Sequence, residues 1–365
     1  MPTAQVSTLN TAVDAIVVGA GVVGLSVATA IARRGGSVVL AGEPRAGEAS
    51  AAAAGMLAPS VERSSGPAHE FAIAARDFYP SYLENLADAT GIRVALNRLG
   101  ILQVALTERG VRGLQKTRSP ASIWLERSDL AALEPTLGHA MGAVHNPDDG
   151  AVDNVTLMKA LRDLVEITPS ISRVVGAAAA VSRGGRHAVV TLLSGEKLEG
   201  AHVVLAPGAW GAMIDGAPSL AAVSPSRGQL VSYESIGLRH VTYGPRGYLV
   251  PRASGAMIAG STTENVGFVS NTTAQGIAKV RSAAEEIAPS LTTARLTAEW
   301  AGLRPVTPDM LPIIGPDPED PRIIFACGHS RNGILLAPLT GETVASMVFG
   351  EEPKHDLSQF RPGRF

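Results

Sequence analysis

The sequence predicts an α/β protein built from two interleaved domains, and three observations carry this prediction. Residues 13–41 alternate apolar runs with glycines, as expected for a strand, a tight turn, a helix and a second strand. Residues 323–349 repeat the strand-then-helix order near the other end of the chain. Residues 92–106 and 224–262 are rich in strand patterns and in proline and glycine turn signals. The outer segments should therefore share one α/β domain, and the strand-rich insertions should pair into a smaller one.

The individual elements follow from the same patterns. Helices are expected where apolar residues recur every three to four positions, and strands in short apolar or alternating runs. Residues 304–321 contain six prolines and are expected to be largely loop. The expected elements are strands at 13–19 and 37–41 around a helix at 22–34, a small-residue loop and helix at 45–59, a helix at 67–90, strands at 188–193 and 201–206, a helix at 271–288, a strand at 323–326 and a helix at 334–349.

Three glycines in the first turn predict a dinucleotide site. Gly19, Gly21 and Gly24 form the pattern G-x-G-x-x-G between the first strand and the first helix. The first glycine permits a tight turn, the second lets the backbone approach a pyrophosphate, and the third lets the helix pack on the strand. Val22 and Val23 then begin a helix whose free N–H groups and dipole favour phosphate.

Such a site usually has an acid at the end of the second strand, where it binds the ribose. In "SVVLAGEP" the in-register position is Gly42, and the acid is Glu43, one residue later. A one-residue slip reverses the direction of a side chain in a strand. Glu43 is therefore expected either to reach the ribose from a turn or to be a solvated turn carboxylate.

Composition excludes several classes of partner. The chain has 365 residues, a formal net charge of −2 and no basic run, which argues against nucleic acid and acidic membranes. Its single cysteine, Cys327, excludes an intrachain disulfide and a multi-cysteine metal site, and it fits a reducing cytoplasm. Ala15–Ala32 is apolar and near transmembrane length, but the glycine spacing explains it better. Residues 1–12 contain no Lys or Arg, so no signal-peptide n-region is expected.

Residues 48–62, "EASAAAAGMLAPSVE", carry little side-chain bulk. This composition is typical of a small helix packed closely on its neighbours, or of a surface on which a flat ring can lie against backbone. No second G-x-G-x-x-G stands between a strand and a helix, so a separate NADPH site is not expected.

Several motifs together carry a family resemblance. "VVGAGVVGLSVA", "SAAAAGMLAP", "GAW", "YLVPR", "WAGLRPVTPDMLPIIG" and "GHSRNGILLAP" occur in this order between about residues 14 and 350. The chain resembles the glycine oxidase branch of the D-amino-acid oxidase family of FAD enzymes. The resemblance implies non-covalent FAD, and hydride transfer from Cα of glycine, sarcosine or a small D-amino acid. It further implies that oxygen is reduced to hydrogen peroxide, and a role in making the thiazole ring of thiamine.

The resemblance also assigns domains and site residues. It implies a Rossmann-type FAD-binding domain, 1–80, 145–222 and 300–365, interleaved with a strand-rich substrate-binding domain, 81–144 and 223–299. It places Arg304, Arg331 and Tyr248 against the substrate, because the planar fork of Arg matches a carboxylate. It assigns to the cofactor Gly19, Gly21, Val22, Val23, Gly24, Gly42, Glu43, Ala49, Ser50, Ala54, Gly55, Met56, His329, Ser330, Arg331, Asn332, Gly333, Ile334 and Leu335.

The stretch "CGHSRNGILLAP" fits this role. Gly328 and Gly333 allow close backbone approach, and the helix that follows can direct its N-terminal dipole at the anionic reduced flavin. His329 is expected to be either a catalytic or a hydrogen-bonded core residue. Cys327 is either a covalent tether for FAD or a small buried side chain.

Two departures from the family pattern concern the pocket and the ribose. Arg246 stands two residues before the tyrosine, where the family has His, and Gly42-Glu43 replaces Glu-Ser. Alternatives also stay open for the activity: a D-amino-acid dehydrogenase or secondary-amine oxidase with another electron acceptor, or a catalytically silent FAD-binding protein. We expect no nucleic acid, membrane or metal partner, and the sequence leaves a homo-oligomer open.

Overall fold

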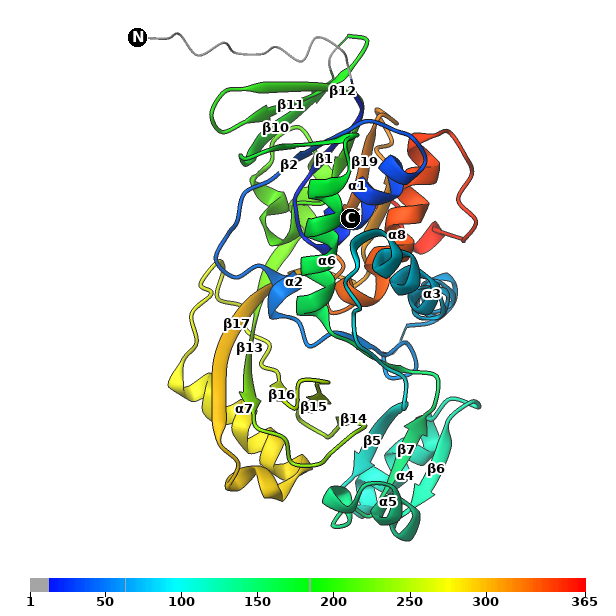
Figure 1. Cartoon of the computed structure of the whole chain (residues 1–365), viewed down its shortest axis with the longest axis vertical. Helices are drawn as coiled ribbons and strands as arrows, with labels where there is room; N and C mark the ends of the chain where they lie inside the picture. Colours follow the sequence, from blue (N-terminus) through cyan, green and yellow to red (C-terminus); the bar gives the residue numbers. More distant parts are fainter. Residues whose placement is uncertain (1–12, 63, 184) are drawn as a thin grey trace.

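The structure is a computed structural model that describes residues 13–62, 64–183 and 185–365. It contains two large sheets, one in the upper half of Figure 1 with most of the helices, the other in the lower half. Two long neighbouring strands, β13 (Ser224–Tyr233) and β17 (Leu296–Val306), run from the upper half into the lower half. The expected α/β fold class is confirmed by these sheets and by the comparisons given below.

The first sheet contains eight strands. Its central strand β12 pairs in parallel with β1 and β19 and antiparallel with β11. The expected strand–helix–strand opening is present, with α1 (Val22–Arg33) between β1 and β2. The strands are β1 (Val13–Val18), β2 (Val38–Ala41), β9 (Ile171–Val174), β10 (Ala178–Arg183), β11 (Ala188–Leu192), β12 (Lys197–Leu205), β18 (Ile313–Pro316) and β19 (Ile323–Cys327).

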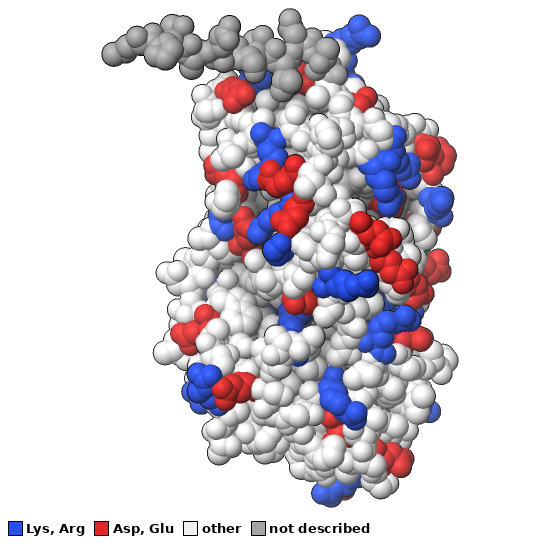
Figure 2. All heavy atoms as spheres, viewed as in Figure 1, with Lys and Arg blue, Asp and Glu red and all other residues white. Residues whose placement is uncertain are grey.

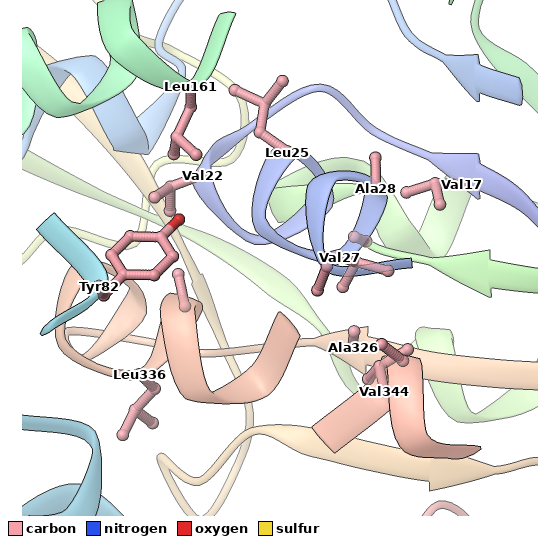
Figure 3. Close-up of a cluster of buried hydrophobic side chains, with 14 of the residues drawn as sticks. Val17, Val22, Leu25, Val27, Ala28, Tyr82, Leu161, Ala326, Leu336 and Val344 are labelled. Carbon is pink, nitrogen blue, oxygen red and sulfur yellow. The ribbon is translucent and has the colours of Figure 1, made fainter. Parts of the chain in front are cut away.

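Four helices pack together beside this sheet: α1, α3 (Pro67–Thr90), α6 (Asn154–Ile167) and α8 (Gly333–Val348). Figure 3 shows side chains of α1 between the other three, with Leu161 of α6, Tyr82 of α3 and Leu336 of α8 around Val22 and Leu25. All five side chains are buried. Each contributes about 1.5–3 kcal/mol through burial of apolar surface, so this core fixes the N-terminus of α1.

The second sheet joins strands from two distant stretches of chain. Its order is β17-β13-β16-β15-β14-β5-β7-β6, and β14 pairs in parallel with β5. The domain limits stay a prediction, and residues 1–12 of the first segment lie outside the described residues. The remaining strands of this sheet are β5 (Ile101–Ala105), β6 (Ile123–Glu126), β7 (Gly142–Asn146), β14 (Val241–Tyr243), β15 (Tyr248–Pro251) and β16 (Met257–Gly260).

Smaller elements complete the fold. Helices α4 (Glu108–Thr117) and α5 (Arg127–Leu133) lie against β5 to β7, and α7 (Ala274–Ile287) lies against β13, β15 and β16. A short sheet is formed by β3 (Met56–Leu57), β8 (Gly150–Val152) and β4 (Leu96–Asn97), next to the one-turn helix α2 (Ala49–Ala52) in the small-residue segment.

Residues 304–321 differ in part from expectation. The proline-rich segment contains the end of β17 and all of β18. Both are edge strands, since β17 pairs with β13 and β18 with β19 alone, and proline is tolerated where no neighbour needs its missing N–H.

The long apolar run near the start is divided between β1, a turn and the 12-residue α1. Across the described parts of the chain, no helix is both long and apolar enough to cross a membrane. On the face shown in Figure 2, Lys and Arg are mixed with Asp and Glu, and neither sign of charge dominates.

Candidate active site

A deep cavity lies where the first sheet meets β13 and β17. Its lining combines the β1–α1 turn, the end of β2, helix α2, the start of α8 and residues of the second sheet. Of the residues assigned from the sequence, Gly24, Asn332 and Leu335 do not line it. Those that do are Gly19, Gly21, Val22, Val23, Gly42, Glu43, Ala49, Ser50, Ala54, Gly55, Met56, Tyr248, Arg304, His329, Ser330, Arg331, Gly333 and Ile334.

The three glycines of the first turn have different environments. Gly19 has φ +104°, and a Cβ there would lie 2.2 Å from the carbonyl oxygen of Ala206. A Cβ on Gly24 would lie 1.8 Å from the Gly19 oxygen, so the helix could not pack on its strand. At Gly21 the nearest atom is Ser50 Oγ at 3.3 Å, and the position faces the cavity. Gly19 and Gly24 are therefore required by the fold, whereas Gly21 leaves space for a ligand.

Helix α2 is held against this turn by polar contacts. The Val22 N–H donates to Ser50 Oγ at 3.0 Å, and Asn154 Nδ2 donates to the Ser50 carbonyl at 2.9 Å. The buried Arg252 guanidinium donates to Asn154 Oδ1 and, at 2.8 Å, to the Val152 carbonyl. This chain of bonds connects the loop after β15 to the N-terminus of α1.

The end of β2 explains the shift of the acidic residue. A Cβ on Gly42 would lie 3.0 Å from the Ala20 nitrogen, so the turn leaves little room for a side chain there. Glu43 lines the cavity and its carboxylate accepts from Arg45 Nη2 at 3.2 Å. The Arg45 guanidinium lies 5.3 Å from the ring centre of Trp210. Glu43 is therefore within the cavity, and its contact with a ribose stays a prediction.

The C-terminal loop turns sharply into α8. Gly328 and Ser330 have positive φ, +68° and +50°, and the Ser330 N–H donates to the Pro305 carbonyl at 2.9 Å. His329 is buried, with Nε2 3.2 Å from Thr340 Oγ1, and burial lowers its pKa to about 3. His329 is thus a neutral, hydrogen-bonded residue, which supports the core interpretation over the catalytic one.

Cys327 lies in the same cavity wall and is 2% exposed. Burial raises the pKa of its thiol to about 12. Only the thiolate is a good nucleophile, so this thiol is poorly suited to form a covalent tether.

Arg304, on β17, is fixed by groups that the sequence did not indicate. Its Nη2 donates to Ser261 Oγ at 2.7 Å and its Nη1 to the Thr262 carbonyl at 3.2 Å. A Cβ on Gly228 would lie 2.2 Å from Nη2, so the absence of a side chain there makes room for the guanidinium. Burial lowers the pKa of Arg304, and no acidic group of the described residues lies within 4 Å of it. Among the described residues, the site therefore holds a partly buried cation without an acidic partner.

Arg331, two residues before α8, differs in this respect. Its Nε lies 3.4 Å from Glu62 Oε1, and its side chain is 44% exposed. Burial opposes its charge, but Glu62 and two tyrosines raise its pKa overall. Both arginines lie near Tyr248, which is buried and against whose hydroxyl a Cβ on Gly260 would lie at 2.5 Å.

Arg246 does not enter the cavity. It is exposed and pairs with Glu286 of α7 at 2.6 Å. The polarity of the pocket is therefore not altered by this departure from the family pattern.

Sequence reasoning missed several cavity residues, because they become neighbours only through strand pairing. Gly228 and Ser261 lie on or beside β13 and β16, and the "GQL" after Arg227 resembles an ordinary turn signal. Trp210 lies in the quoted "GAW" motif, which was the one available signal for that wall. Among the residues whose positions are described, no three His, Cys, Asp or Glu side chains are grouped to hold a metal ion.

The sequence of this chain is similar to those of known proteins over nearly its whole length. Residues 14–347 match the family model described as "FAD dependent oxidoreductase". Glycine oxidase of Bacillus licheniformis is 34% identical over 93% of this chain and 94% of its own length. The bifunctional protein ThiO/ThiG of a Synechocystis species is 32% identical over 98% of this chain but 55% of that protein, so the chain spans about half the length of such relatives.

Structural similarity indicates the same family. The crystal structure of glycine oxidase from Geobacillus kaustophilus superposes with a TM-score of 0.90 at 30% identity, covering 97% of this chain and 100% of that one. The family resemblance read from the sequence is confirmed by these matches, and FAD is the cofactor of the family. The chain belongs to the D-amino-acid oxidase family of FAD-dependent oxidoreductases.

Proposed function

We propose that this protein oxidises glycine or another small amino acid, such as sarcosine or a small D-amino acid, at the Cα–N bond. The observation that carries the proposal is Arg304, a partly buried guanidinium with no acidic partner among the described residues. An uncompensated buried cation is unfavourable, and a substrate carboxylate supplies the missing anion. The full-length similarity to glycine oxidases supports the same substrate class.

The cavity fits FAD on the evidence of its backbone. Gly21 leaves open space beside the N-terminus of α1, where the helix dipole and the N–H groups of the first turn favour a pyrophosphate. The small side chains of Ala54 and Gly55 and the start of α8 form a second wall with little bulk. FAD held there would supply the acceptor for the hydride of Cα and the route by which its electrons reach oxygen, giving hydrogen peroxide.

Arg304 binds and orients the substrate carboxylate. Because Ser261 and the Thr262 carbonyl hold both terminal nitrogens, the plane of the guanidinium is fixed before the substrate arrives. Tyr248 adds a hydroxyl beside the same group. Glycine has no side chain that the protein could bind, so the contacts to its carboxylate determine the position of its Cα.

Other residues of the cavity control charge and protons. The N-terminal dipole of α8 stabilises negative charge in the cavity, whereas the charge of Arg331 is offset by Glu62 at 3.4 Å. His329 is neutral above about pH 3 and its Nε2 is engaged by Thr340, so it is not offered as a base. We infer that the substrate reacts as the free amine, without a dedicated protein base.

The relatives support a proposal for the physiological role. The ThiO/ThiG relatives combine a region like this chain with a second region in one polypeptide. We propose that this chain supplies the imine of glycine for the thiazole ring of thiamine. We place the reaction in the cytoplasm, in accord with the single buried thiol. A homo-oligomer is left open.

A peroxide assay on the FAD-loaded enzyme tests the proposal. Glycine, sarcosine, D-alanine and D-proline should produce hydrogen peroxide with consumption of oxygen, and at least one should be a good substrate. The matched anaerobic assay replaces oxygen with a dye or quinone acceptor. Turnover confined to that assay would identify a dehydrogenase, and no turnover of any amino acid in either assay would contradict the proposal.

A further inference from the structure

The second arginine of the cavity is neutralised by an acid that lies outside the cavity lining. Arg331 lines the cavity, whereas Glu62, 3.4 Å from its Nε, does not. Arg331 is close enough to Arg304 for its charge to add to the effect of burial in lowering the pKa of Arg304. Both guanidiniums thus line one cavity, and among the described residues only Arg331 has an acidic partner within 4 Å.

Glu62 is held in this position by the loop that carries it. The N–H groups of Val61 and Glu62 donate to the Ala58 carbonyl at 3.1 and 3.2 Å, which closes a turn. Ser60 in the same turn is fixed by Asp149, because its N–H and Oγ donate to the Asp149 carboxylate at 3.1 and 3.0 Å. Asp149 is completely buried and also accepts from Arg76 at 3.1 Å. The backbone that carries Glu62 is therefore held at the edge of the site.

A further donor lies beside Arg331. The Tyr243 hydroxyl is buried and, among the described residues, has only the Arg331 guanidinium close enough to act as a polar partner; its ring centre is 5.7 Å from that of Tyr248. Arg331 is close enough to Tyr243 for each to affect the other's ionisation. A cation and a hydroxyl without any other polar partner among the described residues thus lie together in the cavity that holds Arg304. Arg331 and Tyr243 together could bind a second anionic group, but Arg331 is already paired with the Glu62 carboxylate.

We propose that Glu62 determines substrate class by restricting this site to amino acids with a single carboxylate. The inference rests on the proposed function, with Arg304 as the anchor. A substrate with a second carboxylate would bring it towards Arg331, where it meets the Glu62 carboxylate at close range. Like charges so placed exclude a wrong ligand more strongly than lost contacts do. Without the charge of Glu62, Arg331 and Tyr243 would be free to bind that second carboxylate.

The test is a ligand titration of FAD-loaded enzyme, with acetate and malonate as non-reacting probes and the flavin absorbance spectrum as the readout. In the wild type, malonate should bind no more than a few-fold more tightly than acetate. In Glu62→Gln, the ratio of malonate to acetate affinity should rise by at least about tenfold, the scale of one charge-assisted hydrogen bond. The double variant Glu62→Gln/Arg331→Gln should lose that gain.

Glu342→Gln is the matched control. Glu342 pairs with Arg33 at 2.6 Å and is about as exposed as Glu62, but it does not line the cavity. This control should keep the wild-type ratio. An unchanged ratio in Glu62→Gln, a wild type that already prefers malonate tenfold, or no carboxylate binding to Glu62→Gln would each overturn the inference.

Turnover separates this inference from the proposed function. Relative kcat/KM for iminodiacetate and D-aspartate against glycine should rise in Glu62→Gln, together with the malonate ratio. If the wild type oxidises glycine while the malonate ratio does not respond to Glu62→Gln, the proposed function stands and the role of Glu62 fails. If neither enzyme oxidises any amino acid but the ratio rises, the proposed function fails and the electrostatic role of Glu62 stands.

Discussion

The two ends of the cavity are built in different ways. The β1–α1 turn is made by residues that are neighbours in the sequence, and its geometry follows from backbone contacts at Gly19 and Gly24. The proposed substrate end gathers Arg304 from β17, Gly228 from β13 and Ser261 from the end of β16. Local sequence therefore specifies the geometry of the proposed cofactor end, whereas strand pairing between distant segments specifies that of the proposed substrate end.

The largest effect is expected from substitutions in the glycine turn between β1 and α1. Gly21→Val should give a folded protein that no longer binds FAD, because the added side chain occupies space that faces the cavity and meets no backbone atom. Gly24→Val should instead prevent folding, because its Cβ would overlap the Gly19 carbonyl. Flavin absorbance and circular dichroism of both variants measure the difference. Retained FAD in folded Gly21→Val would show that the pyrophosphate lies elsewhere.

At the substrate end, Gly228→Ala should displace the Arg304 guanidinium while FAD stays bound. The new Cβ would lie 2.2 Å from Nη2, and the arginine can move only by giving up Ser261 or the Thr262 carbonyl. We expect kcat/KM to fall by at least about tenfold, since a hydrogen bond to a charged group contributes about 1.5–3 kcal/mol. Steady-state kinetics at matched FAD content is the measurement. Unchanged kcat/KM would mean that the position of this guanidinium is not critical.

The C-terminal loop should impose a pH dependence on stability. Burial lowers the pKa of His329 from about 6.5 to about 3, so between these values the unfolded state binds a proton that the folded state does not. Stability should therefore rise with pH through this window and level off above it, by an amount on the order of a few kcal/mol. His329→Gln should flatten the dependence of Tm on pH between 4 and 7. An equally steep dependence in the variant would assign it to other groups.

The smallest effect is expected at the edge of the cofactor end. Glu43→Ala should weaken FAD binding by about 1 kcal/mol, the net contribution of one exposed hydrogen bond. Glu43 is partly exposed and already shares its carboxylate with Arg45. Fluorescence titration of the apoprotein with FAD gives the value. A loss as severe as that of Gly21→Val would establish Glu43 as the principal ribose ligand.

Sequence reasoning succeeded where the determinants are local. The opening strands and helix, the small-residue helix and the loop before α8 were all located, because turn glycines and apolar periodicity act over a few residues. It failed at edge strands β17 and β18, where prolines suggested loop. It also gave weight to Arg246, which pairs with Glu286 on the surface. The contacts of Arg304 could not be read, since Ser261 lies 43 residues away in the chain.

Among the described residues Arg331 has an acidic partner and Arg304 has none. Kinetics at matched FAD occupancy test directly whether Arg304 is therefore the arginine that binds the substrate carboxylate. Arg304→Ala should reduce kcat/KM for the best amino-acid substrate by the equivalent of roughly 2–5 kcal/mol, because the substrate carboxylate loses its buried partner. Arg304→Lys should also be poor, since a point charge does not reproduce the planar fork. Arg331→Ala should cost less, because Glu62 already neutralises that charge. Near wild-type kcat/KM in Arg304→Ala with severe loss in Arg331→Ala would contradict the account.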